Sequence, residues 1–388
     1  MTPRLSPDLG TVECGSPMLS RLRSAFRLQE SGLLLIILAL GVLLTMFSGT
    51  VRTPQFQITS DGTRERVFTV DKEGERVPAF VERNKFLNAQ NLAQLAKDTS
   101  FIAIMAVGMA LVIISGGIDL SVGSIYALAS VLGALVMHAY GAEGSHSDSP
   151  TLGIVLGIGV CLGVSALCGL LNGGLIVALR VHPFIITLGS MAILRGIAFV
   201  ATKGQSVGNF PSDFRDIVRF ELGQNISVVP LVVMILVTIA GWIFLSRLAA
   251  GRRVYAVGGN ELASQFSGIR VNRVKLWVYL FSGLAAGVAA LLSLGYYGAA
   301  TSGDGQGYEL NVIAAAVVGG ASLTGGRGSA LGVVLGALII QMINSGIVIL
   351  GIDQNYSQII IGAVVIAAVV LDNVTTWLRR RRTLKTAG

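Results

Sequence analysis

A single acidic residue, Asp119, lies within a long and nearly uninterrupted run of apolar and small residues. The sequence around it, Ser115–Ser124, is SGGIDLSVGS. An acid at the centre of a membrane-spanning helix costs about 2.5–3.5 kcal/mol on insertion scales. Intramembrane acids therefore normally face the protein interior or a water-filled cavity. The residue needs a structural or a functional reason for its position.

Three roles are open for Asp119. The glycine pair before it, Gly116-Gly117, allows a helix to end, and Asp119 or Ser121 can then cap the next helix by accepting backbone N–H bonds. Alternatively, Asp119 lines a solute path or belongs to a proton relay. We favour the cap, because no second intramembrane acid or histidine is placed to pass a proton on. Polar residues that are candidates for lining a path are Asp119, Ser121, Asn172, Thr187, Ser190, Asn311 and Asn344. Each of them can equally form a hydrogen bond between helices.

No other chemistry stands out in the sequence. The three histidines are scattered, the three cysteines form no disulfide framework, and no metal-ligand spacing occurs. A Gly-x-x-x-x-Gly-Lys phosphate loop is absent, so the chain has no ATP site of its own. We expect neither a catalytic residue nor a bound metal or cofactor.

The composition is that of an integral membrane protein. Of 388 residues, 53% are hydrophobic and only 13% are charged, against about 25% charged residues in soluble domains. The formal charge is +8. We assign this charge to the excess of Lys and Arg on the cytoplasmic side of membrane proteins rather than to nucleic-acid binding.

The hydropathy pattern predicts an all-α, polytopic transmembrane bundle. A span needs about 20 apolar residues, and some of the candidate spans meet at glycine-rich breaks, so that not all need be full-length helices. The candidate spans are roughly 31–48, 92–115, 118–138, 151–178, 183–202, 228–246, 276–299, 309–323, 329–350 and 357–376. The predicted organisation is a cytoplasmic tail at 1–30, a transmembrane domain at 31–376 and a basic cytoplasmic tail at 377–388.

The basic residues set the expected orientation. Arginines gather in the segment 247–275 and in Arg379–Arg382, so both termini and this loop are expected in the cytoplasm. The loop 49–91 then lies outside the cell membrane. Within it, turn signals between short β-prone runs predict a small β-hairpin or meander, the alternative being a linker without regular structure.

The segment around Asp119 has a twin. Gly116–Leu135 and Gly319–Leu338 align without gaps, with 11 of 20 positions identical. The offset gives paired spans the same orientation and predicts a parallel internal repeat, as in some transporters. Asp119 aligns with Ser322, so the twin keeps a small capping residue without the charge.

The cytoplasmic loop 247–275 contains a possible short amphipathic helix over 260–266. Asn260 is the expected cap and Gly268 the expected stop. Such a helix can dock into a soluble motor subunit. The alternative is a basic loop that only fixes the topology.

Four stretches make the sequence recognisable. It resembles the membrane permease subunits of bacterial ABC importers for monosaccharides, the ribose/xylose type. The stretches are MAVGMALVIISGGIDLSVGS (Met105–Ser124), GLLNGGLIVALRVHPFIITLGSMAILRG (Gly169–Gly196), GRRVYAVGGNELASQFSGI (Gly251–Ile269) and AAAVVGGASLTGGRGSALGVVLGALI (Ala314–Ile339). The resemblance extends from about Lys85 to the C-terminus.

The resemblance implies a translocation path for a monosaccharide or related polyol in a bacterial inner membrane, with the loop 49–91 in the periplasm. It also implies partners: two ATPase subunits that bind ATP and Mg, a periplasmic sugar-binding protein, a second permease copy or close paralogue, and membrane lipid. The coupling contact with the ATPase would fall on Asn260, Glu261, Leu262, Ala263, Ser264 and Gly268. The chain departs from the family pattern twice: it has Leu262-Ala263-Ser264 where the family has Glu-Ala-Ala, and it carries an insert at 57–83.

An ion-coupled secondary transporter of a small polar solute is the alternative function. Such a transporter needs more ionisable intramembrane residues than Asp119 and Arg195. A membrane enzyme lacks support, because no nucleophile–base pair is present.

Overall fold

The computed structural model describes residues 28–370, apart from 59–63, 71–74 and 223–225. The two predicted tails therefore lie mostly outside the described residues. Eight described helices are long and apolar enough to cross a membrane. They are α2 (Leu28–Phe47), α3 (Ala89–Ile114), α4 (Val122–Ala139), α5 (Pro150–Leu179), α6 (Pro183–Thr202), α8 (Val228–Arg247), α11 (Val271–Tyr297) and α13 (Ala330–Ile349).

Shorter helices complete the bundle. They are α7 (Ser212–Val218), α9 (Ala249–Gly259), α10 (Glu261–Phe266), α12 (Tyr308–Val318) and an apolar helix at Tyr356–Val370. The predicted all-α polytopic bundle is confirmed, and each of the ten predicted apolar segments contains a helix. The predicted span 309–323 is too long, however. Helix α12 has 11 residues, or about 16 Å at 1.5 Å per residue, which is about half the hydrocarbon thickness.

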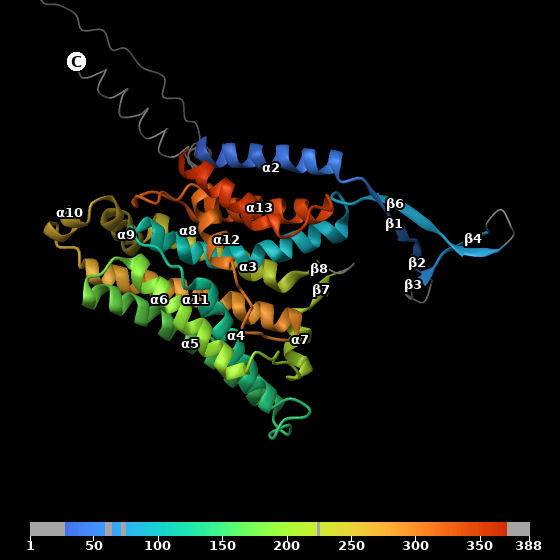
Figure 1. Cartoon of the computed structure of the whole chain (residues 1–388), viewed down its shortest axis with the longest axis horizontal. Helices are drawn as coiled ribbons and strands as arrows, with labels where there is room; N and C mark the ends of the chain where they lie inside the picture. The colour runs from blue at the N-terminus through green and yellow to red at the C-terminus, as the bar shows by residue number, and fades with distance from the viewer. Residues whose placement is uncertain (1–27, 59–63, 71–74, 223–225, 371–388) are drawn as a thin grey trace, which may run out of the picture.

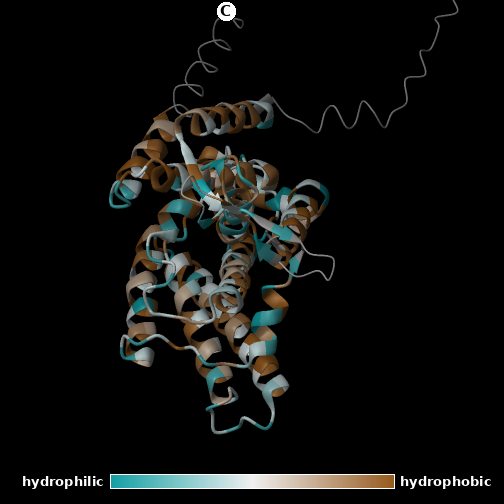
Figure 2. Ribbon diagram, turned by 90° about the vertical axis from the view of Figure 1, so that its right-hand side faces the viewer, coloured by the Kyte–Doolittle hydropathy of each residue, from teal (hydrophilic) through white to brown (hydrophobic). Residues whose placement is uncertain are grey.

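Helix α3 forms the centre of the bundle. From Phe101 to Ile114 its residues are all buried, whereas α5, α6 and α8 expose apolar side chains along most of their length. In Figure 2 the ribbons of the helices are accordingly mainly brown and white. Apolar residues all around a helix are expected for spans that face lipid, so periodicity alone does not reveal which face packs inward.

Small residues let α5 and α11 pack closely. A side chain at Gly169 would overlap the carbonyl oxygen of Tyr279, and one at Gly283 would overlap that of Ser165. Close backbone approach through glycine is a common way for helices to associate in lipid. These two glycines hold α5 against α11 and so position the polar residues described below.

Two glycine-rich breaks interrupt the bundle. Helix α3 ends at Ile114 and α4 begins at Val122, and α12 ends at Val318 with α13 beginning at Ala330. The twin residues make similar local contacts: the Ser121 hydroxyl donates to Asp119 at 2.6 Å, and the hydroxyls of Ser322 and Thr324 lie 2.9 Å apart. The second break is longer, so the gapless alignment places the first turn of α4 opposite non-helical residues. A parallel repeat of whole helices stays a prediction.

The predicted insert forms three two-stranded antiparallel ribbons. Strands β1 (Thr50–Pro54) and β6 (Phe80–Asn84) pair at its base, β2 (Phe56–Ile58) pairs with β3 (Arg64–Arg66), and β4 (Phe68–Val70) pairs with β5 (Arg76–Pro78). The prediction of a small β-hairpin insert is confirmed in kind. Figure 1 shows the ribbons extending from one end of the bundle, with α10 at the opposite end.

The three ribbons meet at a ring of backbone hydrogen bonds. Gln55 donates to Ala79, Ala79 donates to Val67, and Val67 donates to Gln55, at 2.8–2.9 Å. These residues are 12 positions apart, and Arg52, Arg64 and Arg76 recur at the same interval. The insert thus has a local threefold pattern that the turn signals alone do not reveal. Outside the insert, a fourth two-stranded ribbon, β7 (Glu221–Leu222) with β8 (Ile226–Ser227), precedes α8.

Candidate functional site

The Asp119 carboxylate is completely buried at the break between α3 and α4. Its Oδ1 atom accepts hydrogen bonds from the backbone N–H of Ser121 at 3.0 Å and from the Ser121 hydroxyl at 2.6 Å. Its Oδ2 atom accepts from the Ser282 hydroxyl of α11 at 2.8 Å. The carboxylate therefore fixes the turn into α4 and ties that turn to α11. The favoured prediction that Asp119 or Ser121 caps α4 is wrong. Ser121 holds the N-cap position, but its side chain forms no capping hydrogen bond, and Asp119 reaches only the N–H of Ser121 and not those inside α4.

The network continues into α5 and α6. The Asn172 amide donates to the Ser121 hydroxyl at 2.7 Å, and the Ser190 hydroxyl donates to the Asn172 carbonyl oxygen at 2.6 Å. Thr187, which is also buried, donates to Pro183 of its own helix at 3.0 Å. A close neighbour is Tyr279, whose hydroxyl donates to the carbonyl oxygen of Ile118 at 2.9 Å.

Five of the seven candidate path residues thus lie together. Their polar atoms bond to one another or to backbone, and Asp119, Ser121 and Thr187 have no exposed surface. A buried network in which every polar group has a hydrogen-bond partner makes the surrounding helices more rigid. This geometry supports the interhelical role for the group around Asp119, while a role in a solute path stays a prediction.

The other two candidates, Asn311 and Asn344, line a different site. A cavity of about 700 Å³ lies at the opposite end of α3, near the insert, between α3, α12, α13 and the helix at Tyr356–Val370. This volume is within the usual range of about 300–1,000 Å³ for small-molecule pockets. Its polar lining comprises Asn91, Gln94, Asp98, Tyr297, Gln306, Tyr308, Asn311, Gln341, Asn344, Ser345, Gln354, Ser357 and Gln358.

The cavity is rich in uncharged hydrogen-bonding groups. Carboxamides and phenols both donate and accept, as a hydroxyl-rich solute requires. Phe101 and Tyr297 add aromatic surface to the lining. Some groups are already paired, since Gln94 donates to Asp98 at 3.1 Å and Ser357 donates to Asn344 at 2.6 Å. No hydrogen bond within the described residues involves the Gln341 side chain.

Most lining residues of this cavity were missed by the sequence reasoning. They occur singly on helices that are far apart in the sequence, so each looks like an isolated polar residue in an apolar run. A weak signal was present: Gln94 and Asp98 are four residues apart, and Gln341 is followed by Asn344 and Ser345. Residues three or four apart lie on one face of a helix.

Charged residues also gather near the loop that leads into α12, and only one of them, Arg195, was considered from the sequence. The Arg195 guanidinium donates to the backbone carbonyls of Ser302 and Asp304, at 2.8 and 2.6 Å. It thereby ties α6 to the loop that leads into α12. Glu309, in the first turn of α12, has one carboxylate oxygen buried without a partner among the described residues. From the sequence, only Asp119 and Arg195 were recognised as ionisable residues within the membrane.

The predicted short helix of the basic loop is confirmed as α10. The Asn260 side chain accepts from the Ala263 N–H at 2.9 Å, and Gly268 has the positive φ of 81° expected of a helix stop. Glu261 forms an ion pair with Lys275 at 2.7 Å. Of the six predicted coupling residues, Ser264 is buried and Asn260, Glu261, Leu262, Ala263 and Gly268 are exposed.

The most exposed apolar residue of α10 was not predicted. Phe266 is 89% exposed and Leu262 is 66% exposed. They are four residues apart and therefore share one face of the helix. Such an apolar pair in water is typical of a protein contact. Gln265, not Phe266, was expected to lie beside Leu262.

Helix α9, which the sequence did not predict, connects α10 to both glycine breaks. A side chain at Gly258 would overlap the carbonyl oxygen of Ile114 at the end of α3 and would also crowd Gly326. The Gly326 N–H donates to that same Ile114 oxygen at 2.8 Å, and the Tyr255 hydroxyl donates to Gly328 at 2.7 Å. A displacement of α10 therefore has a direct route through α9 to both broken helices.

The chain combines several apolar helices with a polar cavity and an exposed apolar loop helix. This combination is typical of a transport permease. The chain is a member of the family described as branched-chain amino acid transport system / permease component, whose model matches residues 91–369. This membership confirms the resemblance that the four sequence blocks carry.

The chain is similar to several curated sugar permeases. It is 38% identical to the Ribose import permease protein RbsC of Escherichia coli strain K12, over 74% of this chain and 87% of the relative. It is 38% identical to the D-allose transport system permease protein AlsC of the same organism, over 74% and 84%. It is 33% identical to the Fructose import permease protein FrcC of Rhizobium meliloti, over 76% and 80%. No solved structure matches the chain.

Proposed function

We propose that the chain is the membrane permease subunit of an ATP-binding-cassette importer for a monosaccharide or a related polyol. The observation that carries the proposal is the similarity, over most of both chains, to permeases named for ribose, allose and fructose. None of these names supports the alternative of an ion-coupled secondary transporter. ATP and Mg would be bound by separate ATPase subunits, and a periplasmic binding protein would deliver the sugar.

The proposed solute path includes the polar cavity near the insert. Its carboxamides and phenols suit an uncharged, hydroxyl-rich solute, and its aromatic rings can cover the apolar face of a sugar ring. This choice places Asn311 and Asn344 in the path. It leaves Asp119, Ser121, Asn172, Thr187 and Ser190 as the framework that holds α3, α4, α5, α6 and α11 together.

The proposed orientation puts α10 in the cytoplasm and the β ribbons in the periplasm of a bacterial inner membrane. The ribbons and α10 lie at opposite ends of the bundle (Figure 1), and the segment that contains α10 carries Arg247, Arg252, Arg253, Arg270, Arg273 and Lys275. Two permease copies would form the transporter, with α10 of each copy docked on an ATPase subunit.

Reconstitution tests the function directly. The permease, its ATPase and its binding protein are placed in liposomes, and uptake of labelled ribose, allose and fructose is measured. We expect uptake of at least one sugar that requires ATP and the binding protein and persists when ion gradients are dissipated. Uptake driven by a proton or sodium gradient without ATP would contradict the proposal.

A further inference from the structure

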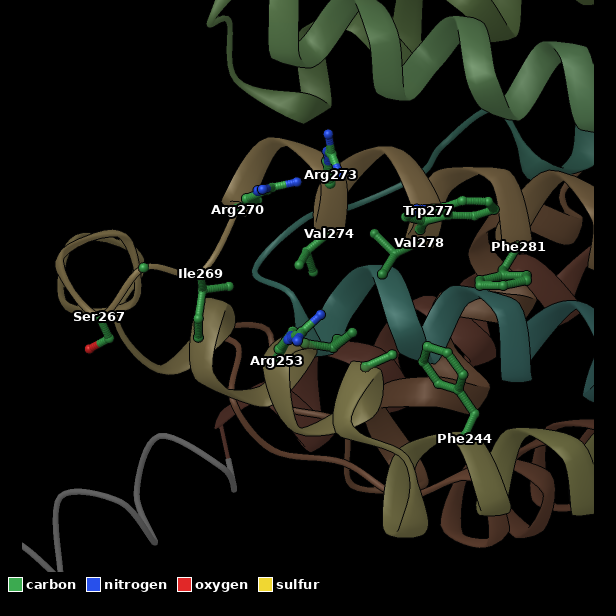
Figure 3. Close-up of a pocket in the computed structure, with 13 residues that line it drawn as sticks. Phe244, Arg253, Ser267, Ile269, Arg270, Arg273, Val274, Trp277, Val278 and Phe281 are labelled. Carbon is green, nitrogen blue, oxygen red and sulfur yellow. The ribbon is translucent and has the colours of Figure 1, made fainter.

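A second cavity, of about 830 Å³, lies at the other end of the molecule, where α8, α9 and α11 meet. One wall is apolar and aromatic, formed mainly by Phe244, Trp277 and Phe281. The Phe244 and Phe281 rings pack edge to face with their centroids 5.6 Å apart, and Trp277 stacks on Phe281. Figure 3 shows Val274 and Val278 directed from α11 into the gap beside these rings. Trp277 is 52% exposed on a helix long enough to span a membrane, so this wall can be reached from outside the bundle.

The mouth of the cavity is strongly basic. Arg253 reaches into the gap from α9, and Arg270 and Arg273 lie where α11 begins (Figure 3). No acidic residue lines the cavity. Within the described part of the chain, these three guanidinium groups form no hydrogen bond or ion pair, whereas Arg195 and the nearby Lys275 both have partners. Three like charges gathered without a partner repel one another unless an anion joins them.

We propose that this cavity binds an anionic phospholipid. The phosphate would lie between Arg253 and Arg270, with Arg273 adding to the positive field, and an acyl chain would lie along Phe244, Trp277 and Phe281. Basic pockets between helices at the cytoplasmic surface bind anionic headgroups in this manner. A free phosphate would leave the aromatic wall unused.

The inference goes beyond the proposed transport function, because it concerns neither the sugar nor ATP. It predicts instead that the joint of α8, α9 and α11, next to α10, is sensitive to lipid composition. The ligand needs only two chemical features, a phosphate with net negative charge and a long apolar chain.

Tryptophan quenching tests the site in the full chain. The chain has three tryptophans, so Trp242→Phe and Trp377→Phe leave only Trp277. The protein is reconstituted in nanodiscs that contain a small fraction of brominated phosphatidylglycerol or, for comparison, brominated phosphatidylethanolamine. We expect phosphatidylglycerol to be preferred by about fivefold for each arginine that contacts its phosphate.

Arginine variants show whether the preference belongs to this cavity. Arg253→Gln together with Arg270→Gln should remove it. Arg252→Gln is the control for the change on α9: it removes one charge next to Arg253, but Arg252 does not line the cavity and instead donates to the Arg247 carbonyl. This control should keep the preference.

Several results would overturn the proposal. One is equal quenching by both brominated lipids, and another is a preference that Arg252→Gln removes as effectively as the double variant. A preference that inorganic phosphate abolishes would indicate a free-phosphate site. If the double variant leaves quenching unchanged but loses the ATPase subunit on co-purification, the arginines contact an acidic protein surface instead.

Discussion

At the scale of single residues, the Asp119 carboxylate stabilises the bundle through the three hydrogen bonds that it accepts. Two come from Ser121 and one from Ser282, so the side chain joins the start of α4 to α11. An amide can replace it with little cost, because a serine hydroxyl can reverse its role and accept from the amide N–H. A methyl group cannot, and it leaves buried donors without partners.

We therefore expect Asp119→Asn to fold and to retain most uptake, and Asp119→Ala to be destabilised by about 1–3 kcal/mol. Thermal unfolding in detergent and uptake in liposomes measure the two effects. Ser124→Ala is the control, because its buried hydroxyl donates to the backbone carbonyl of Ser121 and to none of the side chains of the network. If Asp119→Asn folds normally but abolishes uptake, the charge itself is required and the framework role is wrong.

Gln341 gives the corresponding test of the polar cavity. It lines the cavity, and no hydrogen bond within the described residues involves its side chain, so it is free to bind a solute. Loss of one such hydrogen bond costs about 0.5–1.5 kcal/mol, and Gln341→Leu should slow uptake by roughly 2- to 10-fold without lowering the unfolding temperature. Gln90→Leu makes the same change at an exposed site near the cavity but outside its lining, and should leave uptake unchanged. Equal rates for both variants would remove Gln341 from the path.

At the scale of elements, α10 presents Leu262 and Phe266 to water on one face. An acid at either position should weaken docking of the ATPase without affecting the folding of the bundle, since neither side chain is buried. We expect Leu262→Asp and Phe266→Asp to lose the ATPase on co-purification and to abolish uptake. Asn272→Asp, which adds the same charge at an exposed site outside both α10 and the basic cavity, should retain both. Normal uptake with both test variants would mean that the loop only fixes the topology.

Helix α9 provides a matched pair of glycines for testing transmission. A side chain at Gly258 would overlap the end of α3, whereas Gly259 has open space around its Cβ position. Gly258→Ala should therefore keep ATPase binding but reduce uptake and uncouple it from ATP hydrolysis. Gly259→Ala should behave as the parent protein. If the two variants behave alike, movement does not pass through this contact.

The elements differ in how far the sequence could predict them. Helix α10 was predictable because Asn260 and Gly268 are local signals, and the first break was predictable from Gly116-Gly117. Helix α9 was not, because its amphipathic sequence lies in a basic loop and its close packing depends on Gly258 meeting two distant segments. The polar cavity was not predictable either. Gln94 and Gln341 lie on different helices that are apolar on all sides, so the sequence does not indicate which faces of these helices pack together.

At the scale of the whole molecule, the number of membrane crossings between the ribbons and α10 determines the topology. Five long helices, α3, α4, α5, α6 and α8, lie between Glu65 and Glu261. An odd number of crossings places these two residues on opposite sides. Helix α4 is the critical element, because it has only 18 residues and begins at a break. If α4 did not cross, four crossings would remain and both residues would face the same side.

Cysteine labelling distinguishes these cases. Cys14, Cys161 and Cys168 are first replaced by serine or alanine, and Glu65→Cys and Glu261→Cys are introduced separately. In intact cells a membrane-impermeant maleimide should label Glu65→Cys, because its side chain is exposed on the ribbon at the proposed outer face. Glu261→Cys is also exposed, but it should be labelled only after the membrane is permeabilised. Labelling of both positions in intact cells would show that α4 or another of the five helices does not cross, and it would place α10 where no ATPase can reach it.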